Sequence, residues 1–160
     1  MSATNKYTLS CLVENHFGVL VRIAGLISAR GFNIDSLSVS TTEDPSVSRM
    51  TIVVDADPIK LEQVKNQLNR LIDVIEVKEL KDGQFLDREL LLVRMNVSRE
   101  RQGDLEALLK PFDGKIADVF NAGVVVEATG STAKLDLLVE QLRAYGITSL
   151  VRTGRVALER

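Results

Sequence analysis

The residues best suited to chemistry lie between positions 14 and 35, and they are suited to binding a ligand. A polar loop leads into Gly18, and the helix predicted after it has no acidic side chain in its first turn, residues 18–22. The start of a helix carries free backbone N–H groups and a partial positive charge, which Asp or Glu usually offsets. Because no nearby residue in the sequence does so here, a carboxylate from outside the chain could bind at this position.

An amino acid would satisfy the groups around this loop. The backbone N–H groups of Gly18, Val19 and Leu20 can donate hydrogen bonds to a carboxylate. The side-chain oxygens of Asn15 and Asn33 can accept hydrogen bonds from an ammonium group. Glycine has no Cβ atom, so the backbone at Gly18 can approach such a ligand closely.

The same residues also have a purely structural interpretation. Asn15 could cap the helix, and Gly31 with Asn33 could form the turn after it. His16, the only histidine, is either a solvated loop residue or part of the lining of a ligand loop. The sequence leaves these alternatives open.

Motifs for catalysis are absent from the sequence. His16 and Cys11 are the only residues of their types, and no nucleophile elbow accompanies them. Neither a Walker loop nor a dinucleotide-binding fingerprint occurs, and no cysteines or histidines have the spacing of metal ligands. We therefore expect no catalytic residue, no metal and no cofactor in this chain.

Charge and composition limit the partners. The chain has 160 residues, of which 20 are basic and 22 acidic, giving a net charge of -2. This balance argues against nucleic acid or an anionic membrane as the main partner. The first residues contain no signal-peptide core, and no apolar run approaches the length of a membrane span. With one cysteine, no intramolecular disulfide can form, so we expect a cytoplasmic protein.

Hydrophobic periodicity predicts the same order of elements twice. In the first half, strands are predicted near 7–13, 37–41, 50–54 and 74–79, and helices near 19–27 and 58–71. In the second half, strands are predicted near 91–97, 116–120, 124–129 and 147–151, and helices near 105–109 and 131–142; residues 156–158 could extend the last strand. Two β-α-β-β-α-β units predict an α+β fold of two tandem ferredoxin-like sandwiches, each with two helices covering one face of an antiparallel sheet.

A polar segment at 81–84 separates the two units, which predicts domains at 1–80 and 81–160. RNA-recognition domains have the same order of elements, but they stack bases on aromatic side chains of their central strands. Here the third strand offers Met50, Ile52 and Val54 instead, which argues against RNA binding.

Several runs of sequence carry a resemblance to a known family. They are ENHFGVLVRIAGL at 14–26, RGFNIDSLSV at 30–39, TEDPSVSRMTIVV at 42–54, RELLLV at 88–93 and TGRVAL at 153–158. Together they resemble the small, regulatory subunit of acetohydroxyacid synthase, also called acetolactate synthase. The first half is similar to its ACT domain, an amino-acid-sensing form of the predicted sandwich.

This resemblance implies a function without catalysis. The chain would bind a catalytic large subunit, raise its activity and confer feedback inhibition by valine in branched-chain amino-acid biosynthesis. Thiamine diphosphate, Mg and FAD would belong to that partner alone. Two alternatives remain open at this point: an amino-acid sensor or interaction module serving a different enzyme, and a small stand-alone enzyme on a ferredoxin-like fold.

The resemblance also implies where the effector binds. Two ACT domains would pair into a homodimer with the effector between them. Asn15, Gly18, Val19 and Leu20 would come from one protomer, and Asn33 and Ile34 from its mate. The predicted strand at 34–41 could supply the edge for this pairing, since an exposed edge must be covered or paired to avoid aggregation.

Overall fold

The computed structural model describes residues 5–121 and 123–160. The chain divides into two compact units, one reaching to Leu86 and including Ala157–Arg160, the other comprising Asp87–Val156. The sequence-based prediction places the domain boundary six residues earlier, after residue 80, and assigns the C-terminal residues to the second domain. None of the helices in the described ranges is long and apolar enough to cross a membrane.

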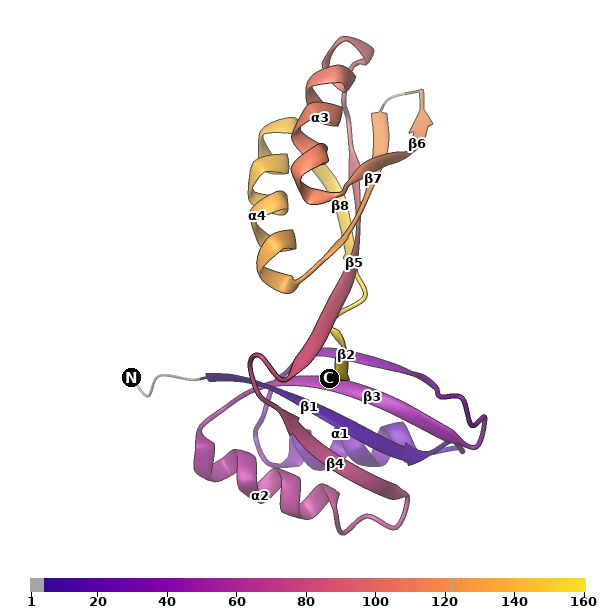
Figure 1. Ribbon diagram of the computed structural model, residues 1–160, viewed down its shortest axis with the longest axis vertical. Coiled ribbons are helices and arrows are strands. Elements are labelled where there is room, and N and C mark those ends of the chain that lie inside the picture. Colours follow the sequence, from indigo (N-terminus) through magenta and orange to yellow (C-terminus); the bar gives the residue numbers. More distant parts are fainter. Residues whose placement is uncertain (1–4, 122) are drawn as a thin grey trace. The chain divides into compact units, whose positions relative to one another are not determined.

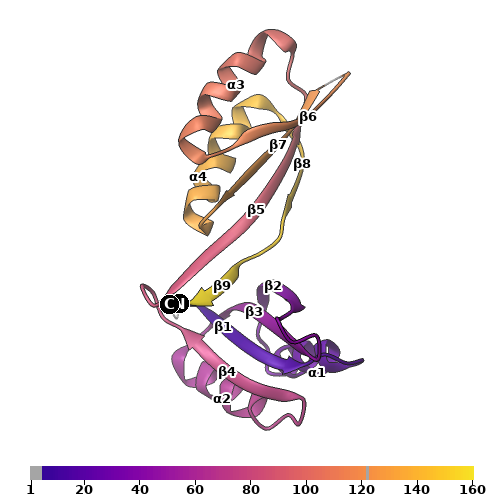
Figure 2. The same cartoon turned by 45° about the vertical axis from the view of Figure 1, so that its right-hand side comes forward.

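The first unit is a sandwich of one antiparallel sheet and two helices. Its elements are β1 (Asn5–Glu14), α1 (Val19–Ala29), β2 (Ile34–Thr41), β3 (Val47–Ala56), α2 (Pro58–Leu68) and β4 (Val74–Leu80). The strands lie in the order β2-β3-β1-β4, and each neighbouring pair is antiparallel. Both helices cover the same face of this sheet (Figure 1, Figure 2). The predicted ferredoxin-like order is confirmed.

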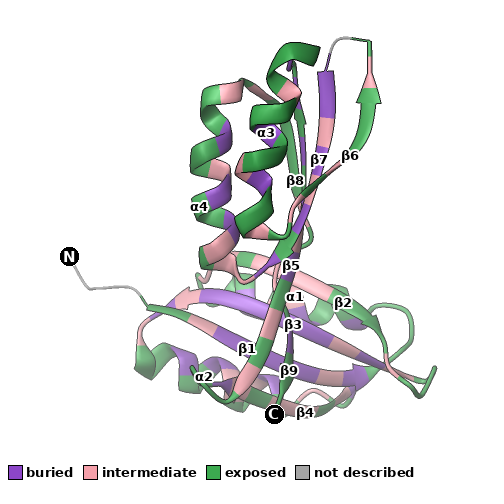
Figure 3. Ribbon diagram, turned by 45° about the horizontal axis from the view of Figure 1, so that its top comes forward, coloured by how far each residue is buried: buried purple, intermediate pink, exposed green. Residues whose placement is uncertain are grey.

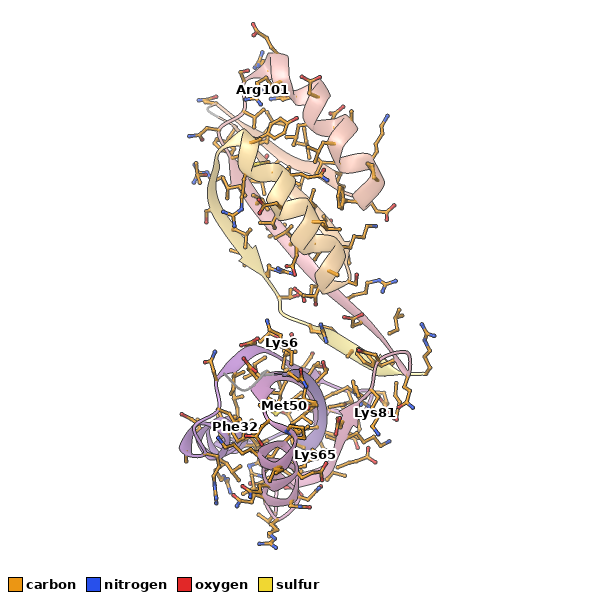
Figure 4. All side chains as sticks on the ribbon, turned by 90° about the vertical axis from the view of Figure 1, so that its left-hand side faces the viewer. Lys6, Phe32, Met50, Lys65, Lys81 and Arg101 are labelled. Carbon is orange, nitrogen blue, oxygen red and sulfur yellow. The ribbon has the colours of Figure 1, made fainter. Side chains whose placement is uncertain are left out.

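Side chains that alternate between the two faces of each strand form the core of the first unit. Leu9 and Cys11 of β1 and Met50 of β3 are buried against Ile23 and Ile27 of α1. Figure 4 labels Met50 and Phe32 within this unit; Phe32 packs against the same core from the turn after α1. The period of two in the strands and the helical spacing in α1 therefore converge on one apolar layer.

Local signals set the start of α2. Asp57 precedes the helix in an extended conformation, and its side chain accepts a hydrogen bond from the backbone N–H of Lys60 at 2.9 Å. Pro58 occupies the first helical position, where its missing N–H costs nothing. An aspartate followed by proline predicts a helix start in the sequence, and the structure confirms this prediction.

The second unit repeats the arrangement. Its elements are β5 (Phe85–Met95), α3 (Gln102–Leu109), β6 (Lys115–Phe120), β7 (Gly123–Gly130), α4 (Thr132–Leu142) and β8 (Ile147–Arg152), with short 3-10 helices at Arg99–Arg101, Lys110–Phe112 and Arg143–Tyr145. The strand order is β6-β7-β5-β8. Buried residues of α3 and α4 face the strands, whereas the outer sides of both helices are exposed (Figure 3). Serine is a residue type that favours the position before a helix, and Ser131 caps α4 by accepting a hydrogen bond from the backbone N–H of Lys134.

The C-terminal strand, β9 (Val156–Glu159), does not extend β8. The chain leaves the strand conformation after Arg152, passes through Gly154 with φ at 78°, and β9 pairs with β5 instead. The backbone N–H of Arg160 donates to the oxygen of Gln84 at 3.0 Å. The N–H of Ala157 donates to the Thr51 hydroxyl at 3.3 Å, so the chain end packs with the first unit.

Candidate ligand-binding site

The start of α1 is the first part of the predicted ligand site. Gly18 precedes the helix with φ at 87°, a left-handed conformation that favours glycine. No side chain caps the helix, and its first turn contains no acidic residue. Neither a side-chain cap nor an acidic residue within α1 itself therefore offsets the charge of this helix end.

Asn15 does not cap α1, so that structural interpretation is wrong. Its side-chain nitrogen donates to the Pro45 carbonyl at 2.9 Å, and its backbone N–H donates to the Ser46 carbonyl at 2.7 Å. These bonds attach the loop before α1 to the turn between β2 and β3. The Oδ1 oxygen of Asn15 accepts no hydrogen bond from the described residues, so it remains available to a donor on a ligand.

Asp73 is a polar residue of this region that sequence reasoning missed. Its side chain is only 7% exposed, and its carboxylate bonds Arg22 Nη1 at 2.7 Å and His16 Nε2 at 2.9 Å. Asp73 lies far along the chain, just before β4. The sequence around the start of α1 therefore does not indicate that Asp73 lies there. The Arg22 guanidinium thus already has a carboxylate partner, which leaves the backbone N–H groups as the donors for a ligand.

His16 is tied into this cluster and is not simply solvated. Its Nε2 also lies 3.2 Å from Glu14 Oε2. A hydrogen bond with the Phe17 carbonyl is the main factor that raises the pKa of His16, and the carboxylates of Asp73 and Glu14 raise it further. The cluster therefore favours the protonated imidazole.

The same three side chains could hold a metal ion. Glu14, His16 and Asp73 each offer one ligand atom, and these atoms lie within 4.8 Å of one another. A divalent cation would have to displace the proton of His16 and compete with Arg22 for Asp73. The absence of a metal from this chain stays a prediction.

Val19 and Leu20 differ in what they present to a ligand. The Val19 side chain is buried in the core, so only its backbone is available, whereas Leu20 is partly exposed on α1. Asn33 and Ile34 lie beyond the other end of the helix. Asn33 is exposed and its side-chain nitrogen donates to Asp35 at 3.4 Å, while Ile34 packs partly against the core.

One chain does not bring all six predicted residues together. Asn15, Gly18, Val19 and Leu20 gather at the start of α1, whereas Asn33 and Ile34 follow its end. The helix has 11 residues, so at 1.5 Å per residue its ends are about 16 Å apart. Gly31, with φ at 76°, forms the exit turn between the two groups, as the structural interpretation predicted.

The described residues near this loop provide no activated nucleophile. Cys11 is fully buried, and burial raises the pKa of its thiol to about 12. Hydrogen-bond donors and acceptors dominate the loop, and this chemistry suits binding.

Comparison with known proteins identifies the class and then the family. The first unit is an ACT domain: residues 9–76 match the family described as "AHAS small subunit-like ACT domain", where AHAS stands for acetohydroxyacid synthase. Residues 88–160 match the family described as "Small subunit of acetolactate synthase". The chain belongs to the acetolactate synthase small-subunit family, which confirms the resemblance seen in its sequence.

Relatives match over almost the whole chain. A probable acetolactate synthase small subunit from Archaeoglobus fulgidus is 45% identical over 155 residues, covering 97% of both chains. The acetolactate synthase small subunit of Mycolicibacterium smegmatis is 40% identical, covering 99% of this chain and 94% of its own. The crystal structure of the small subunit from Thermotoga maritima has a TM-score of 0.87 at 32% identity and covers 98% of each chain.

Proposed function

We propose that this chain is the regulatory subunit of acetolactate synthase. It binds the catalytic large subunit, raises its activity, and makes it sensitive to feedback inhibition by valine. Membership of the small-subunit family supports the partnership. The main support for a shared effector site is that the candidate ligand residues lie at opposite ends of α1. A complete site therefore requires a second copy of the chain.

Pairing through β2 would complete the site. β2 lies at the end of the sheet order and pairs with β3 on one side. If two β2 strands pair antiparallel, the start of one lies against the end of the other. The start of β2 follows Asn33, and the turn after its end is bonded to Asn15. The mate's Asn33 would therefore approach the Asn15 loop.

Valine would bind between the two copies as a zwitterion. Its carboxylate would accept hydrogen bonds from the backbone N–H groups of Gly18, Val19 and Leu20. Its ammonium group would donate to the oxygens of Asn15 and the mate's Asn33. The cofactors of acetolactate formation belong to the catalytic partner, and this chain contributes no catalytic residue.

Regulation then follows from differential affinity. Valine stabilises one arrangement of the dimer, and that arrangement activates the catalytic subunit less well. The effect is limited to the difference in valine affinity between the two arrangements, typically about 1–3 kcal/mol.

Reconstitution tests this function. Acetolactate formation by the catalytic subunit from the same organism is measured with and without this chain, across a valine titration. The chain alone should be inactive, addition should raise the rate, and valine should lower it again. A chain that leaves the rate and its valine response unchanged would contradict the proposal and favour a sensor serving another enzyme.

A further inference from the structure

The second unit has a cavity at the position that corresponds to the Asn15 loop of the first. Its volume is about 430 Å³. Two segments line it: residues 96–102, which lead from β5 into α3, and the region around the turn between β6 and β7, residues 119–123 without 122. In the order of elements, these correspond to the loop before α1 and to the turn between β2 and β3.

In the first unit, hydrogen bonds join the two corresponding segments. Asn15 is bonded through both its backbone and its side chain to the turn at Pro45 and Ser46. In the second unit, the corresponding segments line the cavity. The cavity thus lies between two segments whose counterparts in the first unit are hydrogen-bonded to each other.

The fold of the described strands shapes the floor and one wall of the cavity. A Cβ atom on Gly123 would lie 2.0 Å from the Met95 carbonyl oxygen, so glycine is needed where β7 approaches β5. The Arg94 guanidinium lies 4.7 Å from the centroid of the Phe120 ring, which orders that ring at the wall. The opening is thus built from close strand packing.

The residues that line the cavity are mostly polar, and the charge among them is positive. Arg99 is the charged residue among those that line the cavity, and the side chains beside it are amides, a hydroxyl and apolar groups. The described residues offer the Arg99 guanidinium no ion-pair partner. The next arginine in the sequence is Arg101, which Figure 4 labels. Its guanidinium carbon lies 4.7 Å from the centroid of the Tyr145 ring. Arg99 therefore faces this cavity with a positive charge available to a ligand.

We propose that this cavity binds a small carboxylate anion without an ammonium group, such as a 2-oxo acid. A guanidinium can bind a carboxylate through two parallel hydrogen bonds, and side-chain amides of Asn96 and Gln102 can donate to a ketone oxygen. No acidic side chain lines the cavity to balance an ammonium group. This inference is independent of the proposed valine site, which lies on the other unit.

Titration of the full-length chain tests the site. Backbone amide shifts at residues 96–102 are followed by NMR while 3-methyl-2-oxobutanoate, valine or inorganic phosphate is added. The oxo acid should shift these amides, whereas valine should leave them in place and act near Gly18. Arg99→Ala should weaken oxo-acid binding at least about tenfold, because a charge-assisted pair is lost. Arg99→Lys should keep part of the affinity.

Arg143→Ala is the matched control. Arg143 is an exposed arginine of the same unit, paired with Glu140 at 2.9 Å, and its loss should not change oxo-acid binding. Should Arg99→Ala prove unfolded by circular dichroism, Gln102→Ala takes its place with a smaller expected loss. Three results would overturn the proposal: no shift at these amides up to about 10 mM oxo acid, equal binding of valine or phosphate there, or an equal loss in Arg143→Ala.

Discussion

The side-chain nitrogen of Asn15 donates a hydrogen bond to the carbonyl oxygen of Pro45 at 2.9 Å, joining residues thirty positions apart. This bond holds the loop before α1 against the turn that follows β2. The end of β2 and the start of α1 consequently lie together in one chain, while the start of β2 follows the far end of the helix. Antiparallel pairing of two β2 strands along their full length would bring the two halves of the candidate site together.

Gly18→Asp should abolish valine binding. The new carboxylate would stand at the helix start, where the ligand carboxylate is expected, and the left-handed backbone there disfavours a side chain. Isothermal titration with valine measures the loss. Gly25→Asp introduces the same side chain at an exposed position of α1 with open space around it, and it should bind valine as the wild type does. Equal binding by both variants would contradict the site.

His16 should titrate above its ordinary pKa of 6.5. Because it is the only histidine, its imidazole signals can be followed by NMR without assignment. Asp73→Asn should lower this pKa by removing one charge partner, while the bond to Phe17 keeps part of the shift. A raised folded pKa stabilises the fold fully below pH 6.5, and this contribution fades as the pH rises through the raised value.

The comparison that tests this dependence is thermal melting of wild type and His16→Gln across pH. The difference in Tm should be larger at acidic pH than at alkaline pH. A His16 pKa at or below 6.5, or a difference in Tm that grows with pH, would mean that the cluster does not favour the protonated ring.

Val39→Asp should convert the proposed β2-paired dimer to monomer. Val39 is 46% exposed on β2, and a pair of β2 strands would bring carboxylates on the two copies close together. Ile75→Asp is the control, because Ile75 is 55% exposed on β4, the other edge of the same sheet. Sedimentation velocity distinguishes the two. Dissociation by Ile75→Asp with Val39→Asp still dimeric would assign the pairing to β4.

Gly123→Ala should destabilise the second unit by roughly 1–3 kcal/mol, since the added methyl group would meet backbone and forces the strands apart. Urea unfolding followed by circular dichroism gives the free energy of unfolding. Gly103→Ala, in α3 with nothing within 4 Å of the new atom, should be neutral or stabilising by up to about 1 kcal/mol. If Gly123→Ala proves as stable as wild type, this result would contradict the close packing of β7 against β5 at this position.

Sequence reasoning succeeded where the cause is local. The caps at Asp57 and Ser131 and the exit turn at Gly31 depend on neighbours within a few residues, so the order of elements could be predicted. The family resemblance also rests on short contiguous runs.

Features that depend on distant partners could not be predicted. Asp73 meets Arg22 and His16 only after β4 has joined β1, and the Asn15 bond requires the turn at Pro45 to fold back. β9 has only four residues, and it pairs with β5. Hydrophobic periodicity can indicate a strand, but it does not indicate which strand is its neighbour. The cavity beside Arg99 likewise arises from two segments about twenty residues apart.

The most direct test of a shared effector site mixes two defective chains. Asn33→Ala should weaken valine inhibition by roughly 1–3 kcal/mol as a homodimer, and Gly18→Asp should remove it. In a dimer of one chain of each kind, one site carries both defects and the other has neither. Co-expressed, doubly tagged mixed dimers should therefore regain inhibition at wild-type valine concentrations through that one intact site. Mixed dimers as insensitive as their parents would show that each chain binds its effector alone.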